Sequence, residues 1–238
     1  MSKKEDIINT ALKLFNSHSY NSIGVDRIIS ESGVAKMTFY KYFPSKEKLI
    51  EECLLQRNIN LQISLNETLA QCDQSNYLEQ IESIFKWYNA WFQSEDFNGC
   101  MFQKALEEVI KIYPSTLEPA TQYKIWLTAL IQNLLTHLDI RSPTHLATLI
   151  VIILDGITIQ AHVNKNSVEM SEYWTRVEEG FALIASNSSL KDGDNVLQIS
   201  HGNTLLSLMH RFAPAGYDLS ERPQNGSVTR LDFDTTKP

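Results

Sequence analysis

Residues 24–46 read GVDRIISESGVAKMTFYKYFPSK, and the fold that we predict for the start of the chain rests on this stretch. Its first half carries apolar residues at the spacing of one helical face, namely Val25, Ile28 and Ile29. Gly33 follows as a residue that easily adopts a positive φ, and Phe39 and Phe43 then anchor a second short helix. Two short helices that meet at a steep angle around a glycine are typical of the helix-turn-helix motif.

The outer face of this second helix is the candidate contact surface. In a helix-turn-helix, the second helix projects that face beyond the core, where the major groove of a duplex can receive it. Its side chains are cations, hydroxyls, aromatic rings and one apolar side chain, which suit phosphates and base edges. The predicted DNA contacts are Lys36, Met37, Thr38, Tyr40, Lys41, Tyr42 and Lys46. The two tyrosines are also compatible with half-buried packing roles.

Lys46 stands at the start of a longer helix. Ser45 is a good N-cap for that helix, and Pro44 stops the helix before it. The free N–H groups and the positive dipole end of the new helix attract anions, and Lys46 adds a full charge there. We therefore interpret Lys46 as part of a phosphate clamp. For Lys3 and Lys4, the sequence is equally compatible with contacts to phosphates and with exposure to solvent alone.

Residues 5–50, above all GVAKMTFYKYFPSKEKL, resemble the DNA-binding head of the TetR (tetracycline-repressor) family. That family carries a similar G-V-x-x-x-T-[FL]-Y-x-[YH]-F-x-[SN]-K-x-x-L run. The piece FNGCMF at residues 97–102 resembles a phrase of one TetR subgroup and is a weaker signal. The resemblance implies a homodimer whose helical C-terminal domain binds a small-molecule effector and controls release from an operator.

Composition and charge narrow the class of protein. Of the 238 residues, 43% are apolar, which is enough for a packed core. Residues 1–50 carry 8 Lys and Arg against 5 Asp and Glu, whereas residues 51–188 carry 8 against 17. A positive head on an acidic body confines phosphate affinity to one end of the protein. The net charge of −7 would be unusual for a protein that only coats nucleic acid.

Targeting and cysteine patterns favour a cytoplasmic protein without a membrane partner. The N-terminal MSKKEDII lacks the apolar region of a secretory signal. The longest apolar run, residues 149–154, is stopped by Asp155, well short of the ~20 residues that span a bilayer. Cys53, Cys72 and Cys100 lie far apart and form no C-x-x-C, so we expect no disulfide framework, no metal site and no cofactor.

Periodicity predicts an all-α fold of about nine helices, with no strand pattern before residue 190. The predicted domains are a helix-turn-helix head of three helices (1–48), a helical effector-binding and dimerisation body (49–188) and a short tail (189–238). The helix that follows Ser45 carries Leu54, Leu61, Leu65 and Leu69 at the spacing of one apolar stripe. It is long and begins at the clamp, so we expect it to act as the lever between body and head. Residues 115–118 read as a capping box at the start of a later helix.

The last two helices of the body are the predicted dimer interface, from Thr144 to Asn164 and from Ser171 to Asn187. The first of them is apolar on more than one side, and a helix needs two partners to bury two sides. The family resemblance also implies that these helices pair with their copies. Two heads on a symmetric body would read a near-palindromic operator. An intramolecular core is the alternative.

An effector pocket is expected inside the body. Its predicted lining consists of the apolar walls Trp87, Trp91, Phe102, Tyr123 and Trp126, with Gln103, Glu107, Asp155 and His162 as polar groups. The same residues fit ordinary core and surface positions. An aromatic body with a net negative charge favours a hydrophobic or cationic ligand.

The sequence pattern changes in the tail (189–238), which predicts a strand, a helix and a second strand. VLQISHGNTLLSLMHRF and NGSVTRLDFD resemble the C-terminal end of the histidine phosphatase (phosphoglycerate mutase) family, in which the histidine at the place of His201 helps bind the phosphoryl group. That family also needs an R-H-G segment, and this sequence has none. We therefore expect a catalytically silent β-α-β tail.

These observations favour a sequence-specific DNA-binding transcriptional regulator, a repressor released from its operator by a small-molecule effector, and not an enzyme. One alternative is a histidine-phosphatase-type enzyme with a helical regulatory part, which the missing R-H-G segment disfavours. Another is a helical interaction protein whose head does not bind DNA.

Overall fold

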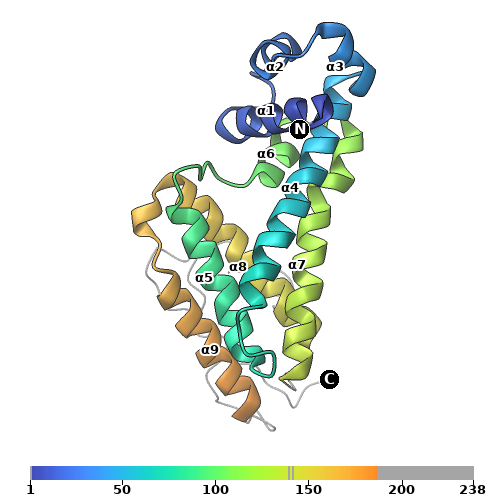
Figure 1. Cartoon of the computed structure of the whole chain (residues 1–238). Helices are drawn as coiled ribbons and strands as arrows, with labels where there is room; N and C mark the ends of the chain where they lie inside the picture. Colours follow the sequence, from blue (N-terminus) through green and yellow to red (C-terminus); the bar gives the residue numbers. More distant parts are fainter. Residues whose placement is uncertain (1, 139, 141, 187–238) are drawn as a thin grey trace, which may run out of the picture. The chain divides into compact units, whose positions relative to one another are not determined.

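The computed structural model describes residues 2–138, 140 and 142–186, and all regular structure in these ranges is helical (Figure 1). The α-helices are α1 (Lys3–Ser17), α2 (Val25–Ser32), α3 (Lys36–Tyr42), α4 (Lys46–Leu69), α5 (Tyr77–Gln93), α6 (Met101–Glu108), α7 (Leu117–His137), α8 (Pro143–Val163) and α9 (Met170–Ser186), with the short 3₁₀ turns η1 (Pro114–Thr116) and η2 (Lys165–Ser167). This confirms the predicted all-α fold for the described ranges.

The chain divides into two compact units, residues 1–179 and residues 180–238. The first unit holds every helix up to α8 and most of α9. The predicted strands of the tail, and His201 between them, lie outside the described residues. The proposed domain boundaries at residues 48 and 188 remain predictions.

Helices α1, α2 and α3 lie together around the N-terminal end of α4 and form the head (Figure 1). Ile7, Ala11 and Phe15 of α1 are fully buried, and α1 contacts both of the following helices. Gly33 ends α2 with φ 66°, a left-handed conformation that a side chain disfavours. The glycine therefore makes the tight corner between α2 and α3 that the sequence predicts.

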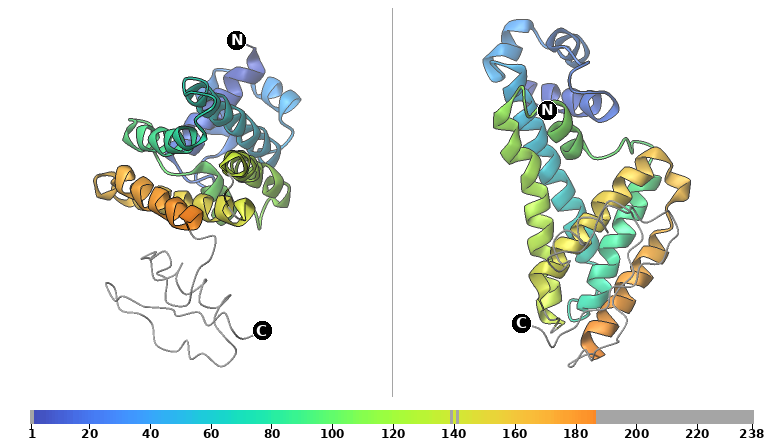
Figure 2. Two further views of the ribbon diagram at one scale, coloured as in Figure 1. Left: turned by 90° about the horizontal axis from the view of Figure 1, so that it is seen from below. Right: turned by 180° about the vertical axis from the view of Figure 1, so that it is seen from behind.

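The body is built on α4, which runs beside α5 and α7, while α8 packs against α7 (Figures 1 and 2). The predicted apolar stripe of α4 is buried, at Leu54, Leu61, Leu65 and Leu69. Because α4 begins in the head and continues through the body, one rigid element joins the two. Its role as a lever remains a prediction.

The start of α7 differs from the predicted capping box. Ser115 and Thr116 do not cap α7: the Ser115 hydroxyl donates to Glu47 Oε1 on α4, and the Thr116 hydroxyl donates to the Tyr113 carbonyl at 2.7 Å. The predicted capping box is therefore wrong, because tertiary and 3₁₀ partners take both hydroxyls. Ser142 does precede α8, but with φ 59° and without a side-chain capping bond.

Helix α8 is apolar on two sides, as predicted. Ile150, Leu154 and Ile157 are buried, whereas Ile152 and Val163 are 48% and 78% exposed. In the described part of the chain, α8 is the one helix whose length and hydropathy would suit a membrane span, and 39% of its most apolar window is buried. By length and composition alone, a core helix of a helical protein looks the same.

Candidate functional site

The predicted contact residues lie together on α3. Phe39 and Phe43 are fully buried and hold one side of this short helix against the head. The opposite side is open: Met37 is 87% exposed, Tyr40 43% and Tyr42 38%. Lys36 and Lys41 are also exposed, and Thr38 is half-buried. The helix thus presents one apolar, two cationic and three hydroxyl-bearing side chains to solvent, a set that suits base edges and phosphates.

Lys36 has an intramolecular partner. Its Nζ lies 3.2 Å from Asp26 Oδ1 on α2, and both side chains are well exposed. An exposed pair of this kind is weak, so a phosphate oxygen could replace the carboxylate. We call the exposed side of α3, from Lys36 to Tyr42, the α3 face.

Lys46 makes a hydrogen bond within the head. The Ser45 hydroxyl accepts a hydrogen bond from the Lys48 amide at 3.1 Å, which confirms the predicted N-cap of α4. The Lys46 ammonium, however, donates to the Tyr20 carbonyl at 2.6 Å. Burial also lowers the pKa of Lys46. Its ammonium is therefore held by the head in this structure, and its phosphate contact remains a prediction.

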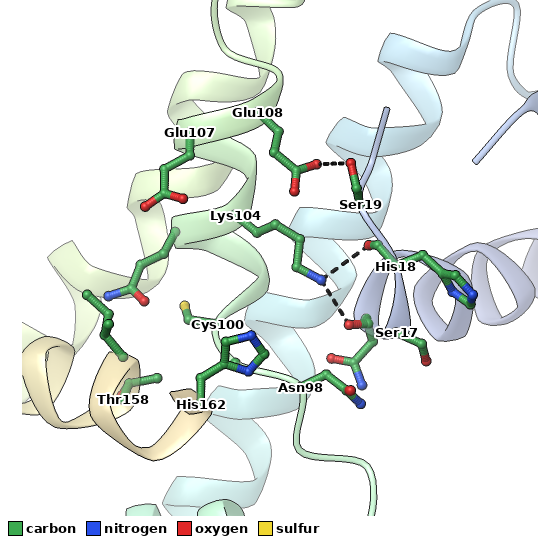
Figure 3. A pocket seen from close by; sticks show the side chains of 14 residues that line it. Ser17, His18, Ser19, Asn98, Cys100, Lys104, Glu107, Glu108, Thr158 and His162 are labelled. Atoms are coloured by element: carbon green, nitrogen blue, oxygen red, sulfur yellow. Dashed lines mark hydrogen bonds between the residues drawn. The ribbon is translucent and has the colours of Figure 1, made fainter. Parts of the chain in front are cut away.

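Sequence reasoning missed the contact between the head and α6. Lys104 of α6 donates to the carbonyls of Phe15 and Asn16, both at 2.9 Å, and of His18 at 3.2 Å. Figure 3 shows its ammonium pointing at the end of α1 beside His18. These are the carbonyls that a helix leaves without partners at its C-terminus, where a cation also suits the helix dipole. Lys104 thus caps α1 from another part of the chain.

Glu108, one turn further along α6, holds the corner after α1. Its Oε2 accepts from the Ser19 hydroxyl at 2.7 Å (Figure 3). The same oxygen accepts from the Tyr20 amide, also at 2.7 Å. The buried Tyr20 hydroxyl donates to the Met101 carbonyl at the start of α6, at 3.1 Å. We call these contacts of Lys104, Glu108 and Met101 with residues 15–20 the α1–α6 junction. Because α6 belongs to the body, the junction couples the head to the body.

An open cleft of about 410 Å³ lies beside this junction (Figure 3). It is lined by Asn16, Ser17, His18, Ser19, Asn98, Gly99, Cys100, Gln103, Lys104, Glu107, Glu108, Thr158, Ile159 and His162. Of the predicted pocket residues, it contains Gln103, Glu107 and His162. Gly99 has φ 78°, and a Cβ there would lie 3.1 Å from the His162 ring, so the glycine permits this close approach.

The predicted aromatic residues of the pocket pack on one another. The Phe102 ring stacks on Tyr123 with centroids 5.4 Å apart, and the Tyr123 and Trp126 centroids are 5.8 Å apart. Trp87 and Trp91 lie 6.0 Å apart on α5. Tyr88 joins these rings through a hydrogen bond of 3.3 Å between its hydroxyl and that of Tyr123.

Asp155, the fourth predicted polar group of the pocket, does not line the cleft that contains His162. Asp155 of α8 forms an ion pair with Lys124 of α7. Burial raises the pKa of Asp155 even though the neighbouring Lys124 charge lowers it. His162 is exposed and lies at the cleft, 6.4 Å from the Phe97 ring. Their effector-binding roles remain predictions.

Comparisons with known proteins agree with this geometry. Residues 7–53 match the sequence profile of the family described as "Bacterial regulatory proteins, tetR family". Over 137 residues, 58% of the chain, the sequence is 30% identical to the uncharacterized HTH-type transcriptional regulator YuxN of Bacillus subtilis (strain 168), and the match covers 32% of that protein. Over 84 residues, 35% of the chain, it is 29% identical to the transposon Tn10 TetC protein of Escherichia coli and covers 41% of it. The chain therefore spans well under two thirds of each of these relatives.

A solved structure shares the fold. SCO4454, a TetR-family transcriptional regulator from Streptomyces coelicolor, superimposes with a TM-score of 0.67 at 19% identity, over 77% of this chain and 96% of that one.

Proposed function

Because residues 7–53 form a TetR-family N-terminal domain, we propose that this protein is a DNA-binding transcriptional regulator that represses by occupying an operator. The observation that carries the proposal is the α3 face, where cations, hydroxyls and Met37 stand exposed over two fully buried phenylalanines. Base edges would meet Met37, Thr38 and Tyr40, while Lys36, Lys41 and Tyr42 would contact phosphates. A regulator of this kind works in the cytoplasm.

The proposed repressor acts as a homodimer through α8 and α9. Ile152, Gly156, Ile159 and Val163 follow one another along the exposed side of α8 at intervals of three to four residues. Such spacing gives a continuous helical stripe. The exposed fractions of Ile152, Ile159 and Val163 are 48%, 55% and 78%. Leaving such a continuous apolar stripe in contact with water is unfavourable. A second copy of α8 would cover it, and the two heads would then read a near-palindromic operator.

Release by a small-molecule effector in the helical body completes the proposal. Two features support a mechanical link between the body and the head. Helix α4 runs through both, and Lys104 and Glu108 connect α6 to the end of α1. A ligand that displaced α6 would therefore alter the placement of the head.

A gel-shift titration tests the proposal. The full-length protein is titrated into duplexes that tile the region upstream of its own gene, with a base-scrambled duplex of equal length as the control. We expect at least one tile to shift at a protein concentration that leaves the scrambled duplex free. If no tile shifts, even at low ionic strength, the proposed function is wrong.

A further inference from the structure

Arg57 is a cation inside the helical body, beside the ring of Trp91. It lies midway along α4, is half-buried, and its Cζ stands 5.9 Å from the centroid of the Trp91 ring. In the part of the chain that the structure describes, no hydrogen-bond acceptor or carboxylate engages its guanidinium. The two other arginines in that part pair with a glutamate one helical turn away, Arg27 with Glu31 and Arg176 with Glu179.

The surroundings of Arg57 make its lack of a partner unusual. A guanidinium carries five N–H donors in a fixed fork, and a buried charge without partners costs free energy. Burial lowers the pKa of Arg57 accordingly. The groups that act on its charge are Cys100, Asp96, Tyr123 and Tyr20, and the one carboxylate among them, Asp96, is exposed and forms no ion pair with it. The Trp91 ring alone, at 5.9 Å, leaves most of the N–H donors unused.

We infer that Arg57 anchors the anionic group of the effector, and that the effector is an organic carboxylate with an aromatic or otherwise apolar body. A carboxylate accepts two parallel N–H bonds from a guanidinium, and Arg suits this geometry better than Lys. The apolar body of the ligand would lie against Trp91 and its neighbour Phe97, whose ring centroids are 5.0 Å apart. This inference rests on the proposed function, and it replaces the cationic ligand that the net charge of the body favours.

The position of Arg57 also links the ligand to the head. Tyr20 and Cys100 both act on the Arg57 charge, and both belong to the region of the α1–α6 junction. Tyr20 bonds to the Met101 carbonyl, and Cys100 is the N-cap residue of α6 and lines the open cleft. The cleft therefore gives solvent access as far as Cys100. A carboxylate held by Arg57 would lie next to both sides of the junction, where it can disturb the contacts that place the head.

A pair of matched probes tests the charge requirement. Naphthalene-2-carboxylate and naphthalene-2-carboxamide have nearly the same shape, and only the first is an anion. Quenching of tryptophan fluorescence and isothermal titration calorimetry measure their affinities for the full-length protein. We expect the carboxylate to bind wild type about tenfold more tightly than the carboxamide, as charge-assisted bonds require. Arg57→Gln removes this preference, Arg57→Lys keeps part of it, and the control Arg27→Gln leaves it unchanged.

Folding and DNA binding are measured on the same variants. Because no hydrogen bond or ion pair holds the Arg57 guanidinium in the described residues, the urea midpoint of Arg57→Gln should not fall, and the variant should still shift the upstream duplex. The carboxylate should release that duplex from wild type but not from Arg57→Gln. Equal affinity of wild type for the two probes, no binding of either at millimolar concentration, or a carboxylate preference that survives in Arg57→Gln overturns the inference. If these results occur while the duplex is still shifted, the proposed function stands.

Discussion

Gly33 and Phe39 show how single residues set the geometry of the α3 face. Gly33 takes φ 66° at the end of α2, and the fully buried Phe39 fixes which side of α3 points inward. Tyr40 lies edge-on to the Phe39 ring, with centroids 5.3 Å apart, and is thereby held on the outer side. The exposed side chains are therefore placed by their buried neighbours in the same short stretch.

Replacing Gly33 tests the corner. Gly33→Ala should lower the free energy of unfolding by about 1 kcal/mol, because a Cβ disfavours the left-handed conformation. Gly24→Ala is the matched control: Gly24 has φ −80°, and nothing lies within 4 Å of a Cβ built there. Urea unfolding measures both variants. A Gly33→Ala protein as stable as Gly24→Ala would show that the corner does not require glycine.

Replacing Lys46 tests whether this residue contacts a phosphate of the DNA or only stabilises the head. We expect Lys46→Ala to weaken binding to all duplexes alike and to reduce the slope of log affinity against log salt by roughly one. Lys46→Ala also removes the hydrogen bond to the Tyr20 carbonyl, which could loosen the head and so weaken DNA binding. If that were the only effect, the salt slope would not change. Anisotropy titrations across a salt series distinguish these outcomes, with the exposed Lys165→Ala of the body as control.

Lys36 could be predicted from the sequence as a site residue, whereas the role of Lys104 could not. The α3 face depends on a contiguous motif whose apolar spacing and glycine are visible in the sequence. Lys104 and Glu108 act on residues 15–20, more than 80 positions earlier in the chain. On α6 they have the i, i+4 spacing of an ordinary surface pair, so no local pattern reveals their role.

Helix α6 is the element on which coupling depends. It ends at Glu108, and the Val109 carbonyl then accepts from the amides of Ile112 and Tyr113 at 2.9 and 2.7 Å. This turn leads into η1 at Pro114, where a proline cannot continue a helix that needs its N–H. Lys104 and Glu108, which contact residues 15–20, both lie within the last five residues of α6.

Removing the α6 cap of α1 should weaken the junction. Lys104→Met keeps the length of the side chain and removes the ammonium that three carbonyls share, so we expect the free energy of unfolding to fall by about 1 to 3 kcal/mol. Lys86→Met, on an exposed part of α5, is the control for loss of a lysine. Hydrogen exchange of the α1 amides should accelerate only in Lys104→Met. Equal stability and exchange in both variants would contradict the capping role.

For the molecule as a whole, the exposed stripe of α8 predicts the oligomeric state. Ile152→Glu should convert the proposed dimer into a monomer, because a charge cannot be buried without a partner between two copies of α8. Ile125→Glu is the matched control, since Ile125 is 66% exposed on α7. Sedimentation velocity gives the mass of each variant. A dimer that survives Ile152→Glu would move the interface away from this stripe.

At this scale, apolar periodicity was enough to predict an all-helical fold, the buried stripe of α4 and the two apolar sides of α8. It could not show how Phe102, Tyr123 and Trp126 would pack, because packing among aromatic rings depends on helix positions that are set across the whole body. Nor could it show that the Arg57 guanidinium forms no ion pair in the described residues, because ion pairing depends on where the carboxylates lie in the folded structure.

The most direct test is the ratio of affinities for the upstream duplex that shifts and for its base-scrambled control, measured by anisotropy at one salt concentration. A specific regulator should give a ratio of roughly a thousand or more for the wild-type protein. Met37→Ala, Thr38→Ala and Tyr40→Ala combined should reduce the ratio towards one while the urea midpoint is unchanged. A variant that keeps the wild-type ratio would contradict the account, because the α3 face would then not read the bases.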